Sequence, residues 1–278
     1  MTSLIVIPTH RSGVALLDNL LQSFAGYDKY PMMIVISGYR PKDRKIFLDI
    51  KTKFAHLPIT WERIETNSFE LGGLYTAQQK SNYDELLLLS HSCEIVNTEI
   101  FDIAFEKYRG RSVAFSLQIG NWKYAQGENE QLTLRHLDRK INRHLVELGE
   151  IKFWQAHIGK YRRAILDQMN LLDYLPTNMI EAISKSELLF TSRYHTADPS
   201  TVVLFPEWTD GTLFEEKCGA TRLKIMNEYI IKWKTHWNTN MVFDEMLRQE
   251  PGYVVKDFLR RKFPTIYSRL KAIGKTTL

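Results

Sequence analysis

The chain has 278 residues, of which 44% are hydrophobic and 12% aromatic, a composition typical of a globular protein with a large core. Two cysteines are too few for a disulfide framework, which argues against a disulfide-stabilised secreted protein and indicates a reducing, cytoplasmic setting. No apolar run approaches the roughly 20 residues of a spanning helix, and no basic stretch precedes an apolar core at the N-terminus, so neither membrane crossing nor export is expected. The net charge of +5 suits anionic ligands such as nucleotide phosphates or lipid headgroups and is weak evidence for nucleic acid.

Strand and helix patterns alternate through residues 1–120. Apolar runs of strand length cover residues 3–11, 32–37, 59–65 and 84–90, and apolar residues near a period of 3.6 predict helices over 13–24, 41–54 and 72–80. A further helix over 98–108 and a strand over 111–119 follow. Strand-helix units of about thirty residues predict right-handed crossovers and a mainly parallel sheet, so the expected fold class is α/β.

Three of the expected strands end abruptly in small polar or basic side chains. These residues are Pro8, Thr9, His10 and Arg11 after the first strand, Ser37 after the second, and Ser90, His91 and Ser92 after the run of four leucines. Ligands of open α/β sheets bind beyond the carboxyl ends of such strands. We therefore expect one polar rim that carries the chemistry.

The pattern changes after Gly120. Residues 132–148 predict a basic amphipathic helix, either a solvated surface helix or an insertion that binds an acceptor or a partner. Residues 151–166 read as a strand end that passes into a helix, residues 184–190 start another helix, and residues 201–206 form a late strand. No repeat or linker is evident, so we divide the chain into an α/β half (1–120), a second half of the same domain (121–240) and a basic amphipathic tail (241–278).

Residues 3–120 resemble the nucleotide-sugar-binding half of GT-A glycosyltransferases, especially family 2-like enzymes. The resemblance rests on V-I-P-T-H-R at the end of the first strand, the L-L-x-x-L-L-x-S helix, Ser37-Gly38, Gly72-Gly73, and the polar triplet after the fourth strand. It implies a GT-A-like fold, related to the Rossmann fold, with a helical C-terminal extension. It also implies that Pro8, Thr9, His10, Arg11, Ser37, Gly72, Gly73, Ser90, His91 and Ser92 bind the donor. Taken without the resemblance, Gly72-Gly73 is more typical of a helix-entry turn.

The triplet at Ser90, His91 and Ser92 stands where the family has its Asp-x-Asp metal motif. Two hydroxyls and an imidazole lack the hard carboxylates that Mg²⁺ or Mn²⁺ prefers, and Glu94 alone comes two residues late. We therefore predict no metal cofactor, with magnesium or manganese as the doubtful alternative. Cations would neutralise the diphosphate instead.

The basic segment 222–237 supplies candidate cations. The family often closes its donor site with a late segment of this kind, so the resemblance assigns Lys232, Lys234 and His236 to donor binding. The alternative interpretation is an amphipathic helix that packs Ile225, Tyr229, Ile230 and Trp233 on the sheet while its lysines face water.

Glu187 is the candidate catalytic base. An inverting transfer needs a carboxylate that takes the proton of the acceptor hydroxyl, and similar enzymes have one near the start of a late helix. The alternative is a capping carboxylate of a helix that begins at Ser184, in the Ser-x-x-Glu pattern. Glu181 and Asp198 are the other candidates for the base.

The tail interleaves aromatic and aliphatic residues with Lys256, Arg260, Arg261, Lys262, Arg269 and Lys271. Such a segment can lie on an anionic membrane surface or dock on a protein. The expected function is a nucleotide-sugar-dependent glycosyltransferase that acts on a glycan or lipid-linked acceptor, in the cytoplasm or peripherally on the inner membrane face, with no nucleic-acid partner. The alternative is a non-catalytic protein of the same fold that binds a sugar nucleotide or glycan.

Overall fold

A computed structural model of the chain describes residues 1–10, 13–121, 150–154, 157–177, 181–206, 216–217, 222–226 and 228–235. All of them belong to one compact unit, Met1–His236. The expected helix over 132–148 and the expected tail helix lie outside the described residues.

Residues 1–107 form the strands and helices that the sequence predicts, together with one short strand over Cys93–Ile95 that it does not. In order they are β1 (Ser3–His10), α1 (Val14–Ser23), β2 (Met32–Ser37), η2 (Pro41–Asp43), α2 (Arg44–Lys53), β3 (Ile59–Arg63), α3 (Phe69–Lys80), β4 (Glu85–Leu88), β5 (Cys93–Ile95), α4 (Glu99–Asp102) and η3 (Ile103–Lys107). The helix expected over 98–108 is thus an α-helical turn followed by a π-helix.

A seven-stranded sheet organises the unit, in the order β10-β6-β9-β4-β1-β2-β3. Strands β1, β2, β3 and β4 pair in parallel, as do β6 (Val113–Ala114) and β10 (Val202–Val203). Only β9 (Gly159–Arg162) runs antiparallel to its neighbours in this sheet, β4 and β6. The predicted α/β class with a mainly parallel sheet is confirmed.

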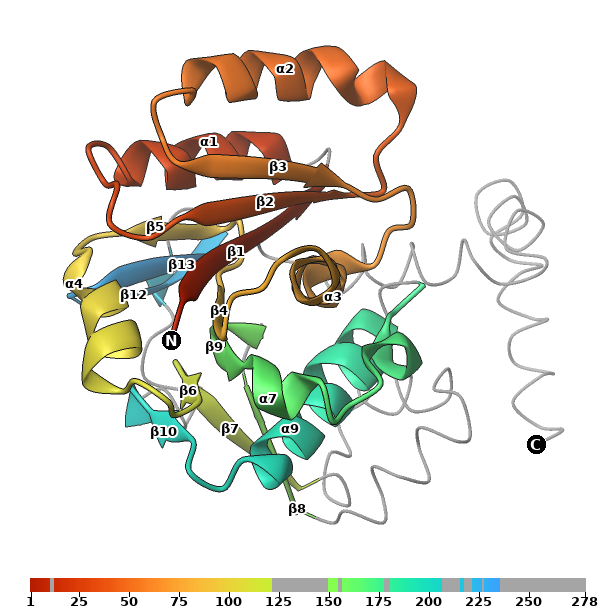
Figure 1. The fold of residues 1–278 in the computed structure, drawn as a ribbon, viewed down its shortest axis with the longest axis vertical. Coiled ribbons are helices and arrows are strands. Elements are labelled where there is room, and N and C mark those ends of the chain that lie inside the picture. The colour runs from red at the N-terminus through yellow and green to blue at the C-terminus, as the bar shows by residue number, and fades with distance from the viewer. Residues whose placement is uncertain are drawn as a thin grey trace, which may run out of the picture. The chain divides into compact units, whose positions relative to one another are not determined.

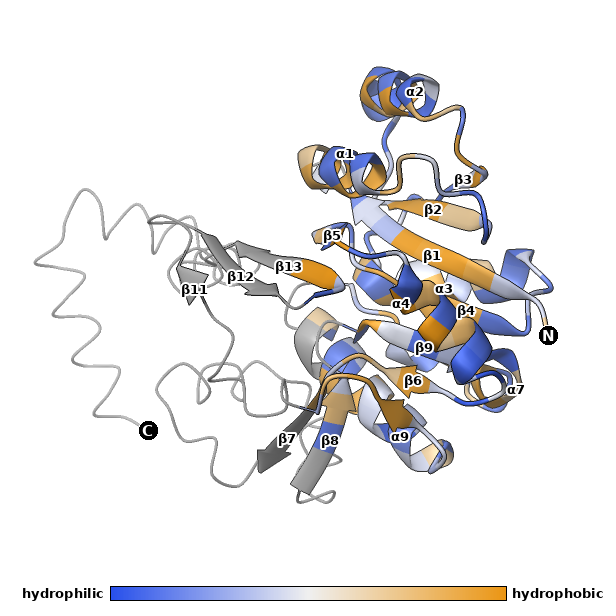
Figure 2. Cartoon of the chain, turned by 90° about the vertical axis from the view of Figure 1, so that its left-hand side faces the viewer, coloured by the Kyte–Doolittle hydropathy of each residue, from blue (hydrophilic) through white to orange (hydrophobic). Residues whose placement is uncertain are grey.

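Apolar side chains fill both faces of this sheet. Helices α1 and α2 lie over one face, and α3, α7 (Arg163–Leu166) and α9 (Thr191–Ala197) lie on the other (Figure 1). Buried residues of β1 alternate between the faces, with Ile5 and Ile7 in one cluster and Leu4 and Val6 in the other. Figure 2 shows β1 turning from hydrophobic to hydrophilic colour toward its carboxyl end. The strand is therefore core along its length and polar only where it ends.

The second half departs from the predicted elements. The strand expected over 111–119 is interrupted, since β6 and β7 (Leu117–Asn121) belong to different sheets, and β7 pairs with β8 (Glu150–Trp154). Residues 151–166 form β8, β9 and α7 rather than one strand and one helix. The remaining helices are η5 (Leu171–Tyr174) and η6 (Ala182–Phe190), the latter a π-helix.

The amphipathic-helix interpretation of residues 222–237 is wrong. Strands β12 (Arg222–Met226) and β13 (Ile230–Thr235) form an antiparallel hairpin, and β11 (Glu216–Lys217) extends it. The alternation of apolar and basic residues from 231 to 234 has the period of two that is typical of a strand. Strand β13 also pairs with β5, so the hairpin joins the segment that follows β4.

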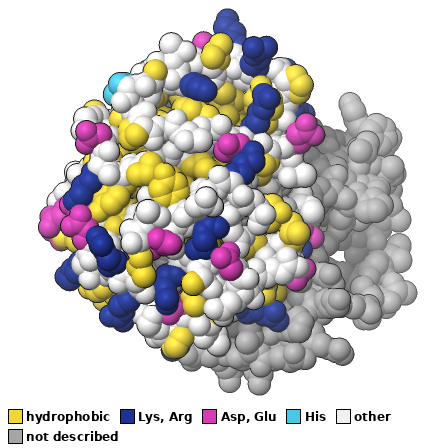
Figure 3. All heavy atoms as spheres, in the orientation of Figure 1, with side chains coloured by type: hydrophobic (Ala, Val, Ile, Leu, Met, Phe, Trp, Pro, Cys, Tyr) yellow, Lys and Arg dark blue, Asp and Glu magenta, His cyan; other side chains and the backbone are white. Residues whose placement is uncertain are grey.

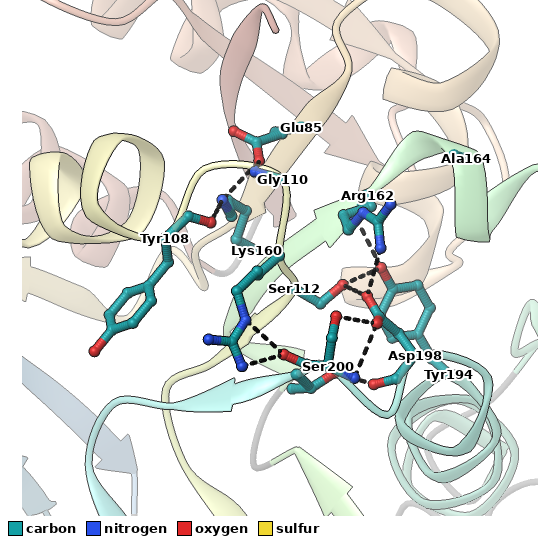
Figure 4. Close-up of polar contacts among 12 residues, drawn as sticks. Glu85, Tyr108, Gly110, Ser112, Lys160, Arg162, Ala164, Tyr194, Asp198 and Ser200 are labelled. Atoms are coloured by element: carbon teal, nitrogen blue, oxygen red, sulfur yellow. Dashed lines mark hydrogen bonds and ion pairs between the residues drawn. The ribbon is translucent and has the colours of Figure 1, made fainter.

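A buried ion pair fixes the register between β4 and β9 (Figure 4). The ammonium group of Lys160, with a side chain 0% exposed, donates to Glu85 Oε1 at 2.7 Å and to the Tyr108 carbonyl at 2.8 Å. Glu85 Oε1 also accepts from Gly110 N–H. Burial lowers the pKa of Lys160, although the Glu85 carboxylate opposes this shift. Since a slip of one residue would separate these charges in an apolar core, the pair holds β9 in one register.

Basic side chains collect on the outer face of α2. Figure 3 shows Lys and Arg gathered over this helix at the top of the view. Its exposed basic residues include Arg44, Lys45, Lys51 and Lys53.

Candidate functional site

The carboxyl ends of β1, β2 and β4 meet at one edge of the sheet. His10 pairs with Ser37 in the register of β1 and β2, and Val6 pairs with Leu88 in that of β1 and β4. The amide of Leu89 donates to the Val6 carbonyl at 2.9 Å, so the ladder continues up to the polar triplet. The structure thus brings together the predicted residues Pro8, Thr9, His10, Ser37, Ser90, His91 and Ser92 of the three strand ends. We call the edge of the sheet that these residues form the polar edge.

His91 is held in place by both neighbouring elements of the polar edge. Its Nδ1–H donates to the Pro8 carbonyl at 3.1 Å, and its ring lies edge-on to the His10 ring at 4.9 Å. On the other side it covers Gly13, where an added Cβ would lie 2.4 Å from Nε2. Gly13 is the N-cap of α1, so the imidazole lies against the helix end whose N–H groups favour anions.

The triplet offers no carboxylate to a metal ion. The hydroxyls of Ser90 and Ser92 lie 3.0 Å apart and both side chains are buried. Within the described residues, no group of three or more His, Cys, Asp or Glu side chains could hold a metal ion. The triplet therefore supplies hydroxyl and imidazole groups but none of the carboxylates that Mg²⁺ and Mn²⁺ prefer.

Thr9 and Ser37 differ in how their hydroxyls are used. Thr9 is buried, and within the described part of the chain its Oγ1 has no hydrogen-bond partner. Ser37 Oγ donates to the Thr66 carbonyl at 3.1 Å and accepts from Ser68 N–H at 2.8 Å. Ser37 therefore fastens the loop after β3 to the polar edge.

Gly72 and Gly73 let α3 approach the strand ends closely. A Cβ at Gly73 would lie 2.8 Å from Pro8 Cβ, and one at Gly72 would lie 2.2 Å from Ser68 Oγ. Both glycines thus serve packing at positions that bring backbone next to the polar edge.

The basic strand β13 runs beside the triplet. Lys232 pairs with Cys93, the residue that follows Ser92, and Lys234 lies on the same face of the strand two residues further along. Backbone pairing therefore places this segment at the polar edge, while Arg11 and His236 lie outside the described residues.

His157 and Ser116 also reach this edge, and the sequence analysis overlooked both. Gly159 pairs with Leu88 on one side and with Ala114 on the other, and Phe115 N–H donates to the Ile158 carbonyl. The residues just before β9, His157 among them, therefore lie toward the ends of β4 and β6, which Ser90 and Ser116 follow in the sequence. Neither lies in a recognisable motif, and the signal is the antiparallel strand itself, which brings the start of β9 next to the end of β4.

Glu187 lies in the middle of a helix rather than near its start. Both Ser184 and Glu187 belong to η6, so the capping interpretation, with a helix that begins at Ser184, is wrong. Burial, and next the charges of Tyr194 and Glu187, raise the pKa of the buried Tyr161 phenol.

The two other candidate bases are engaged in structural contacts. Glu181 accepts from the backbone N–H of Thr177 at 2.8 Å and from its hydroxyl at 3.0 Å. Asp198 is buried and accepts from Ser112 and from Ser200, each at 2.6 Å (Figure 4).

The chain matches no protein-family model and no curated protein. Among solved structures it is similar to TarS from S. aureus, with 16% identity and a TM-score of 0.47 over 94% of this chain and 40% of TarS. It is similar to the mannosyltransferase PcManGT from Pyrobaculum calidifontis, solved with GDP-Man and Mn²⁺, with 11% identity and a TM-score of 0.45 over 73% of this chain and 54% of that one. The galactosyltransferase LgtC, solved with donor and acceptor sugar analogues, gives 8% identity and a TM-score of 0.42 over 73% of each chain.

The chain thus spans 40% of the length of TarS. Because these TM-scores are below 0.5, the α/β class rests on the sheet and helices described above. In the part of the chain that the structure describes, no helix has the length and hydropathy to cross a membrane.

Proposed function

We propose that this chain is a nucleotide-sugar-dependent glycosyltransferase of GT-A type, inverting and metal-independent, which binds its donor at the polar edge. The observation that carries the proposal is the placement of His91, held between the Pro8 carbonyl and Gly13 at the N-terminus of α1. Oriented N–H groups of a helix end attract phosphate, and in its cationic form the imidazole beside them would also donate from Nε2, because Nδ1–H already donates to the Pro8 carbonyl.

Charge neutralisation at this edge does not require a divalent cation. The diphosphate of the donor would meet the first turn of α1, the His91 ring and the basic strand β13, whose Lys232 pairs with Cys93. Preorganised donors and cations of this kind stabilise a leaving diphosphate in the transition state.

In the proposed reaction, Glu187 removes the proton of an acceptor hydroxyl as its oxygen attacks the anomeric carbon. The bond between this carbon and the diphosphate oxygen breaks, and the nucleoside diphosphate leaves with the electron pair. A single displacement inverts the anomeric centre. We propose a glycan or lipid-linked acceptor, in the synthesis of a polysaccharide or glycoconjugate.

Thermal unfolding with nucleotide sugars tests the donor site. UDP-, GDP-, CMP- and dTDP-linked sugars are added at millimolar concentration, with Mn²⁺ or with EDTA. At 100 times its Kd, the true donor stabilises the fold by about 2.7 kcal/mol, and EDTA should not change the shift. If none of these sugars stabilises the folded protein, the donor site is wrong, and complete dependence on Mn²⁺ would refute metal independence.

Two sets of variants locate the ligand. His91→Ala should weaken donor binding about tenfold, whereas His56→Ala, at an exposed position on the loop before β3, should leave it unchanged. Lys232→Gln and Lys234→Gln should each weaken binding several-fold at low salt, against Lys51→Gln on α2 as the control. Donor binding without transfer to any glycan or lipid-linked acceptor would favour the non-catalytic alternative.

A further inference from the structure

His157 is a buried histidine with a strained backbone at the polar edge. Its side chain is 3% exposed and its φ is 60°, in the left-handed region that non-glycine residues adopt at a cost of about 1 kcal/mol or more. Such strain persists only where the surroundings impose it, and it collects at functional sites.

A polar contact with Ser186 orients the His157 ring. Nε2 lies 2.9 Å from Ser186 Oγ, whose side chain is 0% exposed, while Nδ1 is buried and has no hydrogen-bond partner among the described residues. The contact joins the start of β9 to the middle of η6. Because Nδ1 bonds to none of the residues that the structure describes, loss of the Ser186 hydroxyl would remove the polar contact that orients the ring.

The same contact leads to the candidate base. Ser186 directly precedes Glu187, and the Glu187 charge contributes to the raised pKa of Tyr161, after burial and the charge of Tyr194. The Tyr161 hydroxyl in turn donates to the His157 carbonyl at 2.9 Å. His157 therefore contacts both the residue before Glu187 and the phenol whose pKa the Glu187 charge raises.

The other end of this connection is rigid. Strand β9 is held in register by Lys160 and Glu85, and its antiparallel pairing of Gly159 with Leu88 places the residues just before β9 at the carboxyl end of β4. A displacement of about 1 Å in a catalytic group can lower the rate a hundredfold. A fixed connection between the polar edge and Glu187 would therefore help to maintain the rate of transfer.

We propose that His157 is a positioning residue that ties Glu187 to the polar edge through Ser186. This inference rests on the proposed glycosyl transfer. The left-handed backbone turns the imidazole from β9 toward η6, where glycine would meet the same φ without strain but would leave η6 unattached.

Two isosteric substitutions separate positioning from packing. In His157→Gln the amide reaches the position of Nε2 and keeps the contact with Ser186. In His157→Asn the amide occupies the position of Nδ1 and loses that contact, while asparagine tolerates the left-handed backbone better than most residues. We measure kcat, donor KM and melting temperature for both variants, for Ser186→Ala, and for the double variant His157→Asn/Ser186→Ala.

His157→Asn and Ser186→Ala should each lower kcat about ten- to a hundredfold with donor KM unchanged, and the double variant should be no slower than either. His157→Gln should retain most of the wild-type kcat. If all four variants had the kcat of the wild type, or if their losses of kcat followed the losses of melting temperature alone, the positioning role would be overturned and the proposed function would stand. Wild-type protein that transfers no sugar would overturn both.

Discussion

Glu187 has a different setting from the carboxylates that compete with it for the role of base. It lies half-buried in η6, whereas Glu181 caps backbone at Thr177 and Asp198 is held by two serine hydroxyls. A base must keep its proton-accepting oxygen available to the substrate, which these anchored groups do not.

Glu187→Gln keeps the size of the side chain and removes the proton acceptor. We expect turnover to fall by roughly 10²-fold or more, with donor affinity unchanged, in steady-state kinetics and thermal shift. Glu181→Gln is the matched control and should leave turnover within a few-fold. A normal rate in Glu187→Gln would remove the carboxylate mechanism from this residue.

Asp198 gives the fold a defined response to acid. Burial opposes its ionisation, but hydrogen bonds from Ser112 and Ser200 and the charge of Arg162 outweigh burial and lower its pKa. The unfolded chain then binds more protons than the folded one below a pH of about 4, so this stabilisation is present above that pH and is lost as the pH falls through the folded pKa.

Asp198→Asn should lower the melting temperature at neutral pH and flatten the decline in melting temperature below a pH of about 4. Differential scanning calorimetry between pH 2 and 7 measures both effects, with the exposed Asp49→Asn as the control. If the melting temperature of Asp198→Asn fell as steeply with decreasing pH as that of the wild type, other carboxylates would be responsible for the acid destabilisation.

Among the elements, β9 and its ion pair decide how the two halves of the main sheet join. Lys160→Met leaves the Glu85 carboxylate buried without its cation, which should cost about 3–5 kcal/mol of unfolding free energy. Lys29→Met, on an exposed ion pair with Asp102 and Glu106, should cost less than about 1 kcal/mol.

The double variant Lys160→Met/Glu85→Gln should regain most of the lost stability, because no unpaired charge remains and Gln can still accept from Gly110 N–H. Urea denaturation of the wild type and the three variants measures these changes in the free energy of unfolding. Equal losses in the single and double variants would mean that packing rather than charge sets the cost.

The elements also show how far the sequence could predict this molecule. The buried strands β1, β2 and β4 were predictable because a strand covered on both faces is an apolar run, and the polar residues that end them mark the edge. The antiparallel insertion of β9 was not, since local pattern carries no information on strand order. For the same reason His157 and Ser116 were not predicted, although Ser90, at the end of the neighbouring strand β4, was.

The hairpin of β12 and β13 was predicted wrongly for a different reason. Residues 222–235 mix isoleucine, lysine and tryptophan, which fit either period over a short window, and the strand form is decided by pairing with β5. Of the candidate site, sequence therefore supplied the residues on consecutive parallel strands, and long-range pairing supplied the rest.

At the scale of the whole molecule, the basic tail 241–278 and the donor site are separate expectations. Strand β13 ends at Thr235, so a chain that ends at His236 retains every described element. We expect this truncated chain to bind nucleotide sugars like the full chain.

The full chain should sediment with vesicles that contain phosphatidylglycerol and the truncated chain should not, since each basic residue near an anionic surface contributes about 1 kcal/mol. Vesicles of phosphatidylcholine alone are the control. Sedimentation of the truncated chain at the level of the full chain would remove the tail from this role.

The pairing of β5 with β13 has a consequence for biosynthesis. Cys93, next to the triplet, finds its strand partner only at Lys232, so the segment that carries His91 stays without this support until the ribosome has released almost the whole described unit. Parallel strands β1 to β4 can assemble earlier from short-range contacts, while pairings of high sequence separation form slowly. A nascent chain would thus form a stable parallel sheet before its polar edge can bind the donor. Stalled or truncated products that end before residue 230 should therefore fold in part and bind no donor.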